Sequence, residues 1–167
     1  MKVLIAIDSS ECSEFALDSI AKRSWPEDTQ FRVITVVEPA YIQAPLNGIY
    51  AEPMIAAQIE FEKYCRERIN DKVTTLKTAL PDHQISGDVL LGPTAECIID
   101  DAKKWNTDLL VVGSHGRTGL NRFFLGSVAE RVASHSPCSI EIVKQKVASS
   151  KSKPVEATET TAVGGKL

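Results

Sequence analysis

The chain has 167 residues, which is long enough for one domain with a substantial core. Apolar residues make up 43% and charged residues 25% of it, as in soluble globular proteins, and no apolar stretch approaches the length of a membrane span. The net charge of −3 gives no basic excess, so the composition argues against a nucleic-acid-binding surface.

In chain order, the apolar periodicity predicts alternating strands and helices. Strands are expected as short apolar runs, and helices where apolar side chains recur every three or four residues. The expected elements are a strand at 2–7, a helix at 11–24, a strand at 31–37, an irregular loop at 38–53, a helix at 54–80, a strand at 84–91, a helix at 95–105, a strand at 108–112, a helix at 127–135 and a strand at 139–143.

This alternation predicts an α/β fold. Strands that alternate with helices imply parallel βαβ units with right-handed crossovers, and continuous apolar strands fit a sheet with helices on both faces. From about Val147 the composition changes to Ser, Lys, Thr, Glu and Gly, which cannot form a packed core. We therefore expect a single domain over 1–146, built on an open, twisted parallel sheet, and a disordered tail over 147–167.

Cysteine use favours a reducing compartment. The four cysteines, at positions 12, 65, 97 and 138, are widely separated, and they form neither a Cys-x-x-Cys pair nor a zinc-binding spacing. Asp8 interrupts the short apolar run at the start of the chain, so we interpret this run as a strand and not as a signal peptide. Together these observations predict reduced thiols and a cytoplasmic location.

A glycine-rich loop follows the fourth predicted strand. Residues 113–127 read Gly-Ser-His-Gly-Arg-Thr-Gly-Leu-Asn-Arg-Phe-Phe-Leu-Gly-Ser and lead into a helix. Glycines let backbone N–H groups approach an anion, the helix N-terminus adds partial positive charge, and Arg117 and Arg122 add full charges. The loop matches neither a dinucleotide fingerprint nor a Walker A loop. It predicts a phosphate-containing ligand, with a plain flexible turn as the alternative.

Asp8 and Ser127 each have a structural and a ligand-binding interpretation. Asp8 either caps the first helix or faces a ligand crevice beyond the carboxyl ends of the strands. If the first and fourth strands are neighbours, Asp8 and the glycine loop face the same crevice, where the carboxylate can accept hydrogen bonds from an adenine amino group or a ribose hydroxyl. Ser127 begins a capping box with Glu130, and it either caps the helix alone or also contacts a phosphate.

These motifs resemble the universal stress protein family, in its ATP-binding branch. The glycine pattern of that family, Gly-x2-Gly-x9-Gly-Ser/Thr, is complete here as Gly113, Gly116, Gly126 and Ser127. The N-terminal Ile-Ala-Ile-Asp and the late Ser-Pro-Cys-Ser-Ile-Glu-Ile-Val are also similar, so the resemblance covers about residues 1–144. It implies five parallel strands in the order 3-2-1-4-5. The last strand then lies at a sheet edge, so a homodimer through this strand is expected.

The resemblance also implies roles for individual residues. Asp8 would contact adenine or ribose, Val36 would line the adenine pocket, and the loop and the start of the following helix would hold the phosphates. Mg²⁺ or Mn²⁺ would be held mainly by the phosphates, with no metal-binding side chain assigned. With Arg117 added for its charge, the expected binding residues are Asp8, Val36, Gly113, Gly116, Arg117, Gly126, Ser127 and Val128.

We therefore expect an ATP-binding protein of stress response or regulation, with little or no turnover. The sequence shows no well-placed general base and no pair of metal-binding carboxylates, so no catalytic residue is assigned. The alternative is a slow ATPase or an enzyme of nucleotidyl or phosphoryl transfer. A protein that binds no nucleotide and acts only through partners is disfavoured by the complete glycine pattern.

Overall fold

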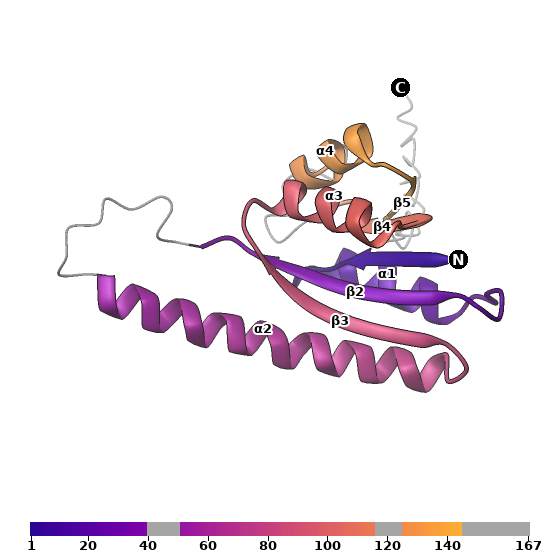
Figure 1. The fold of residues 1–167 in the computed structure, drawn as a ribbon, viewed down its shortest axis with the longest axis horizontal. Coiled ribbons are helices and arrows are strands. Elements are labelled where there is room, and N and C mark those ends of the chain that lie inside the picture. The colour runs from indigo at the N-terminus through magenta and orange to yellow at the C-terminus, as the bar shows by residue number, and fades with distance from the viewer. Residues whose placement is uncertain (40–50, 116–124, 145–167) are drawn as a thin grey trace, which may run out of the picture.

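One five-stranded sheet lies between two layers of helices (Figure 1). The computed structural model describes residues 1–39, 51–115 and 125–144, so the expected tail over 147–167 lies outside the described residues. The elements are β1 Lys2–Ala6, α1 Glu11–Ala21, β2 Gln30–Val37, α2 Ala51–Ala79, β3 Gln84–Leu91, α3 Thr94–Trp105, β4 Leu109–Gly113, α4 Ser127–His135 and β5 Ser139–Val143.

The sheet is parallel throughout, and its order is β3-β2-β1-β4-β5, which confirms the expected α/β fold. The central strand β1 pairs with β2 on one side and with β4 on the other. The register places Ala6 of β1 opposite Val112 of β4, so the carboxyl ends of these two strands lie side by side. This is the position at which the strand order reverses and at which open parallel sheets bind ligands.

Alternate side chains of the central strands fill two separate cores. Ile5 of β1 packs with α1 and α2, whereas the preceding Leu4 packs with α3 and α4, and both side chains are fully buried. The α1–α2 core includes Ile20 and Leu76, and the α3–α4 core includes Val132. Because both faces are covered, these strands are apolar on both sides, and this is why they read as continuous apolar runs in the sequence.

Helix α2 begins earlier than expected and extends beyond the sheet. The loop predicted over 38–53 ends earlier than expected, because α2 already starts at Ala51. Pro53 lies in the first turn of this helix, where proline is tolerated. Its C-terminal half packs on the sheet, whereas Ile55 and Ile59 in the N-terminal half are 50% and 62% exposed. Figure 1 shows this half projecting past the strands. Within the described residues, no helix is long and apolar enough to cross a membrane.

Gly87 of β3 allows α2 to lie close against the sheet. A Cβ atom at this position would come within 2.4 Å of Cγ2 of Ile69 and 2.7 Å of Cγ2 of Val73, both on α2. Any side chain at Gly87 therefore pushes these two helix residues away. The placement of α2 relative to the sheet depends on this glycine.

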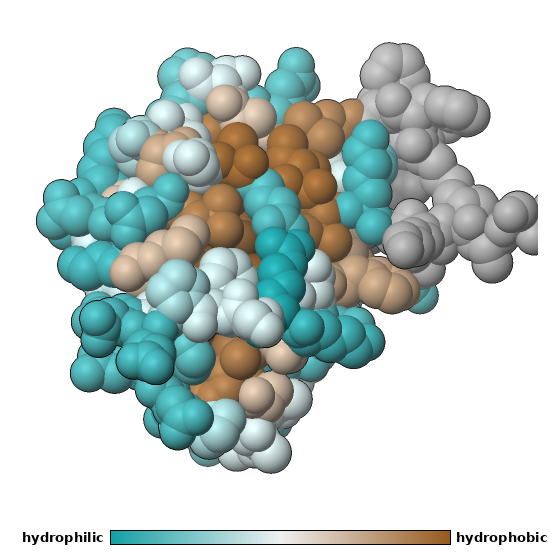
Figure 2. All heavy atoms as spheres, turned by 90° about the vertical axis from the view of Figure 1, so that its right-hand side faces the viewer, coloured by the Kyte–Doolittle hydropathy of each residue, from teal (hydrophilic) through white to brown (hydrophobic). Residues whose placement is uncertain are grey.

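The amino ends of the strands, on the opposite side from the crevice, face the viewer in Figure 2. Apolar side chains gather in the middle of this face, and hydrophilic side chains surround them. Lys2 connects this end of β1 to its neighbours, since its backbone N–H donates to Asp108 at 2.7 Å and its Nζ donates to the carbonyl of Trp105 at 3.0 Å. The Lys2 ammonium also lies 5.5 Å from the centre of the Trp105 ring.

An ion pair joins α1 to the edge strand β5. Arg23, just after α1, donates from Nη1 to Oε2 of Glu141 at 2.6 Å and from Nη2 to Oε1. These hydrogen bonds favour the charged carboxylate and lower the pKa of Glu141 from its ordinary value.

We expect Glu141→Gln to lower the free energy of unfolding at neutral pH by about 0.5–1 kcal/mol. Because the pKa of Glu141 is lower in the folded than in the unfolded protein, its contribution is fully present above the unfolded pKa of about 4.3 and disappears as pH falls through the folded value. The stability difference between wild type and variant should therefore shrink as pH falls below about 4.3. Urea titrations at pH 7 and at acid pH measure this difference in the free energy of unfolding. The control is Asp18→Asn, which removes the carboxylate of the exposed Asp18–Lys22 pair. A difference that stays constant with pH would contradict this assignment.

Candidate functional site

A cavity of about 430 Å³ lies at the carboxyl ends of β1, β2 and β4, between α2 on one side and α3 and α4 on the other. Its volume is in the range of small-molecule sites. Gly116 and Arg117 lie outside the described residues. All the other predicted binding residues line this cavity: Asp8, Val36, Gly113, Gly126, Ser127 and Val128.

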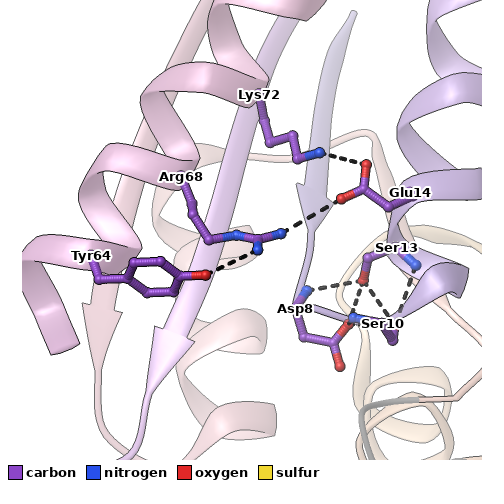
Figure 3. Close-up of polar contacts among 7 residues, drawn as sticks. All are labelled: Asp8, Ser10, Ser13, Glu14, Tyr64, Arg68 and Lys72. Carbon is purple, nitrogen blue, oxygen red and sulfur yellow. Dashed lines mark hydrogen bonds and ion pairs between the residues drawn. The ribbon is translucent and has the colours of Figure 1, made fainter.

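Asp8 is held in one orientation by the start of α1 (Figure 3). Its Oδ1 accepts hydrogen bonds from the backbone N–H of Ser10 at 2.9 Å, from the Ser10 hydroxyl, and from the Ser13 hydroxyl at 2.6 Å. The N-cap of α1 is Ser10, whose Oγ accepts from the N–H of Ser13, so the alternative that Asp8 is the cap is wrong. The bonds all reach Oδ1, and Figure 3 shows the other oxygen on the side away from both serines. The carboxylate is thus held in one orientation, and among the described residues no donor reaches its Oδ2.

Gly113 brings the end of β4 against the start of α1. A Cβ atom on Gly113 would lie 2.9 Å from Cβ of Cys12 and 3.3 Å from the backbone nitrogen of Ser13. This close packing carries the end of β4 into the wall of the cavity beside Asp8. Besides its place in the lining, Gly113 therefore has a packing role that its position in the glycine pattern does not reveal.

The N-terminus of α4 forms another part of the wall. Its N-cap is Gly126, with φ −64° and ψ 148°, and no side chain among the described residues caps it. Ser127 is the first residue of the helix, so the capping box expected from Ser127 and Glu130 is wrong. The N–H of Glu130 donates to the carbonyl of Gly126 at 2.9 Å, and the N–H of Gly126 donates to the carbonyl of Ser114 at 2.9 Å. The N–H groups of the first turn have no intrahelical acceptor, and together with the helix dipole they favour an anion.

Two valine side chains add apolar surface to the cavity wall. Val36 at the end of β2 and Val128 in α4 are partly buried against the α3–α4 core, and both line the cavity. At the rim, Glu38 caps α3, since its Oε1 accepts from the backbone N–H of Thr94 at 3.0 Å and from the Thr94 hydroxyl at 2.6 Å. This pairing of a loop residue with a helix start 56 residues later has no local sequence signal.

The wall formed by α2 was missed by sequence reasoning. Phe61, Tyr64 and Arg68 line the cavity from this helix. Their spacing of three and four residues places them on one helix face, which is visible in the sequence. The sequence does not show, however, that this face lies across the crevice from α1 (Figure 3).

Fold and site together define a doubly wound α/β protein with a ligand crevice where the strand order reverses. The model of the universal stress protein family matches residues 1–144. Universal stress protein MJ0531 of Methanocaldococcus jannaschii is 44% identical over 144 residues, which cover 86% of this chain and 82% of the relative. This chain belongs to the universal stress protein family.

Solved structures share the fold. Hypothetical protein MJ0577 of Methanocaldococcus jannaschii is 25% identical, with a TM-score of 0.69 over 87% of this chain and 96% of that protein. A universal stress protein from Archaeoglobus fulgidus in complex with dAMP is 20% identical, with a TM-score of 0.57 over 86% of this chain and 98% of that protein.

Proposed function

We propose that this protein binds ATP, or a related adenine nucleotide, and belongs to the ATP-binding branch of its family, acting in regulation or stress response. The observation that carries the proposal is that one cavity holds both an oriented carboxylate, Asp8, and the N-terminus of α4. A nucleotide has hydroxyl and amino donors at one end and phosphates at the other. The complex of the Archaeoglobus fulgidus relative with dAMP supports this class of ligand.

The lining residues suit the separate parts of a nucleotide. Oδ2 of Asp8 would accept from an adenine amino group or a ribose hydroxyl, and Val36 would contact the apolar face of the base. The backbone N–H groups at the start of α4, with the hydroxyl of Ser127, would donate to phosphate oxygens. Phosphate donors and the base-binding surface thus come from different elements, which the sheet holds in fixed positions.

A divalent cation, Mg²⁺ or Mn²⁺, would be held mainly through the phosphates and would neutralise part of their charge. In the described part of the chain, no group of three His, Cys, Asp or Glu side chains is placed to hold a metal ion. We propose little or no turnover, with a rate well below about 1 per second. Phosphate release measured at saturating ATP tests this, and a rate of ordinary enzyme size would favour the alternative of an ATPase or transferase.

Calorimetry with Mg-ATP is expected to show saturable binding by the wild type and about 10- to 150-fold weaker binding by Asp8→Asn. Asparagine retains an Oδ1 that accepts from Ser10 and Ser13, but it replaces Oδ2 by an N–H₂ donor, so it removes the ligand contact while it keeps the local bonds. Asp18→Asn on the exposed side of α1 is the control and should bind as the wild type does. Absence of binding heat and of thermal stabilisation by ATP, ADP and AMP in the folded wild type would refute the proposal.

We also propose a homodimer through β5 and a cytoplasmic location. The cysteines at 12, 65, 97 and 138, which all lie within the described residues, form no disulfide with one another, as is expected in a reducing compartment. The dimer is supported by the position of β5 at the edge of the sheet.

A further inference from the structure

We infer that Tyr64 stacks on the base of the bound nucleotide and gives the site a preference for purines. Arg68 and Glu14 act as residues that position the Tyr64 ring. This inference rests on the proposed function, because it assigns the base-binding wall of the same cavity. It depends on the side chains that α2 contributes to the cavity wall.

Two aromatic rings of the cavity wall, both on α2, are exposed to solvent. Tyr64 is 51% and Phe61 43% exposed, and both line the cavity. Their ring centroids are 6.4 Å apart with an interplanar angle of 25°, so the rings are roughly parallel. Exposed aromatic surface beside a cavity provides a platform on which a planar base can stack.

A chain of polar contacts holds Tyr64 in place (Figure 3). Arg68 donates from Nη1 to the Tyr64 hydroxyl at 3.2 Å, and its guanidinium carbon lies 5.8 Å from the centre of the Tyr64 ring. The Nη2 of Arg68 is 3.7 Å from Oε1 of Glu14 on α1, and the Nζ of Lys72 is 2.5 Å from Oε2 of the same carboxylate. The ring is therefore tied, through Arg68, to α1.

The same helix orients both sides of the base-binding region. The N-cap and first turn of α1 fix the Asp8 carboxylate through Ser10 and Ser13, and the same turn carries Glu14, which anchors Arg68. Figure 3 shows Tyr64 and Arg68 extending from α2 toward α1, on the side of the crevice opposite Asp8. A base whose amino group or ribose reaches Asp8 would therefore face the cavity wall that carries Tyr64.

The charges of this wall suit a base better than a phosphate. Glu14 partly neutralises Arg68 and Lys72, so the α2 wall offers aromatic faces and little free positive charge. The anion-binding N–H groups lie instead on α4, which covers the other face of the sheet from α2. Val36 lines the cavity from the α3–α4 side, so a base held between Val36 and Tyr64 would be enclosed from both sides. Purines present the larger stacking face and gain more from this arrangement than pyrimidines.

The test measures Mg-ATP, Mg-CTP and inorganic tripolyphosphate affinities by calorimetry. Tyr64→Ala should weaken ATP binding about 5- to 150-fold and reduce the preference for ATP over CTP, with tripolyphosphate affinity unchanged. Tyr64→Phe retains the ring but loses the hydroxyl that accepts from Arg68, so it should keep the preference for ATP over CTP and bind ATP with an affinity between those of the wild type and Tyr64→Ala. Ile59→Ala is the matched control, because Ile59 is exposed on the same helix and does not line the cavity.

A tryptophan at the same position provides a direct readout of stacking. In Tyr64→Trp, ATP should quench the emission of the new indole, whereas Trp25 and Trp105 do not line the cavity and should respond little in the wild type. Wild-type binding of ATP together with equal affinity and equal base preference in Tyr64→Ala would overturn the inference and leave the proposed function standing. Wild type that binds no nucleotide would overturn both.

Discussion

Gly126→Leu is expected to abolish nucleotide binding and to leave the fold intact. Gly126 has φ −64° and ψ 148°, which any L-residue adopts without strain. Its two backbone hydrogen bonds, to Ser114 and from Glu130, do not depend on the absence of a side chain. A leucine side chain on the cavity wall would instead block the approach of phosphates to the N–H groups of α4. Loss of two charge-assisted hydrogen bonds would weaken binding by about 100-fold or more.

Calorimetry with Mg-ATP measures this loss, and circular dichroism with thermal melting establishes that the variant is folded. Gly126→Ser is an informative companion, because serine is a good N-cap and its hydroxyl would compete with phosphate for the same N–H groups. It should melt no lower than the wild type and still bind ATP more weakly. Wild-type affinity in a folded Gly126→Leu protein would show that the α4 N-terminus is not the phosphate site.

The elements were predictable from the sequence because their apolar periods are strong. β3 and β5 have the expected bounds, 84–91 and 139–143, β1 and β2 differ by one residue at one end, and β4 is shifted by one residue at both ends. The order 3-2-1-4-5 follows from the family resemblance, because apolar runs alone do not show which strands are neighbours. Once that order is known, Asp8 is expected to lie beside the end of β4. The structure places both Asp8 and Gly113 in the lining of one cavity.

The sequence-based predictions failed where one local sequence pattern is compatible with more than one three-dimensional arrangement. Ser127 and Glu130 have the spacing of a capping box, but the backbone of Gly126 is already extended at the cap position, so the helix starts at Ser127. The role of Tyr64 was not predictable, because it depends on Arg68 reaching Glu14 of α1, 54 residues earlier in the chain. Such contacts depend on where a long helix lies on the sheet, which a periodic pattern does not specify.

Ile142→Pro is expected to convert a homodimer into a monomer. β5 is at one edge of the sheet, and the carbonyl of Val143 accepts from the N–H of Ser114 at 2.8 Å, so the polar groups of Val143 face β4. Because backbone groups alternate in direction along a strand, the N–H and C=O of Ile142 and Ile140 face outward at the free edge. Proline at 142 therefore removes an edge donor without breaking a bond to β4.

The side chains of β5 do little to prevent such pairing. Ile140 and Ile142 are partly buried on the α3–α4 side and Val143 on the α1–α2 side, so both faces of the edge are apolar. The only charge inside the strand, Glu141, is paired with Arg23. A second copy related by a twofold axis would pair with β5 in antiparallel orientation and continue the sheet across both subunits.

Sedimentation equilibrium at micromolar concentration should give twice the chain mass for the wild type and the chain mass for Ile142→Pro. Ile142→Ala is the matched control, because it removes the same partly buried side chain but retains the N–H, and it should remain largely dimeric. If Ile142→Ala dissociates as fully as Ile142→Pro does, side-chain packing and not backbone pairing holds the two copies together. A wild type that sediments as a monomer rules out the dimer as a stable state.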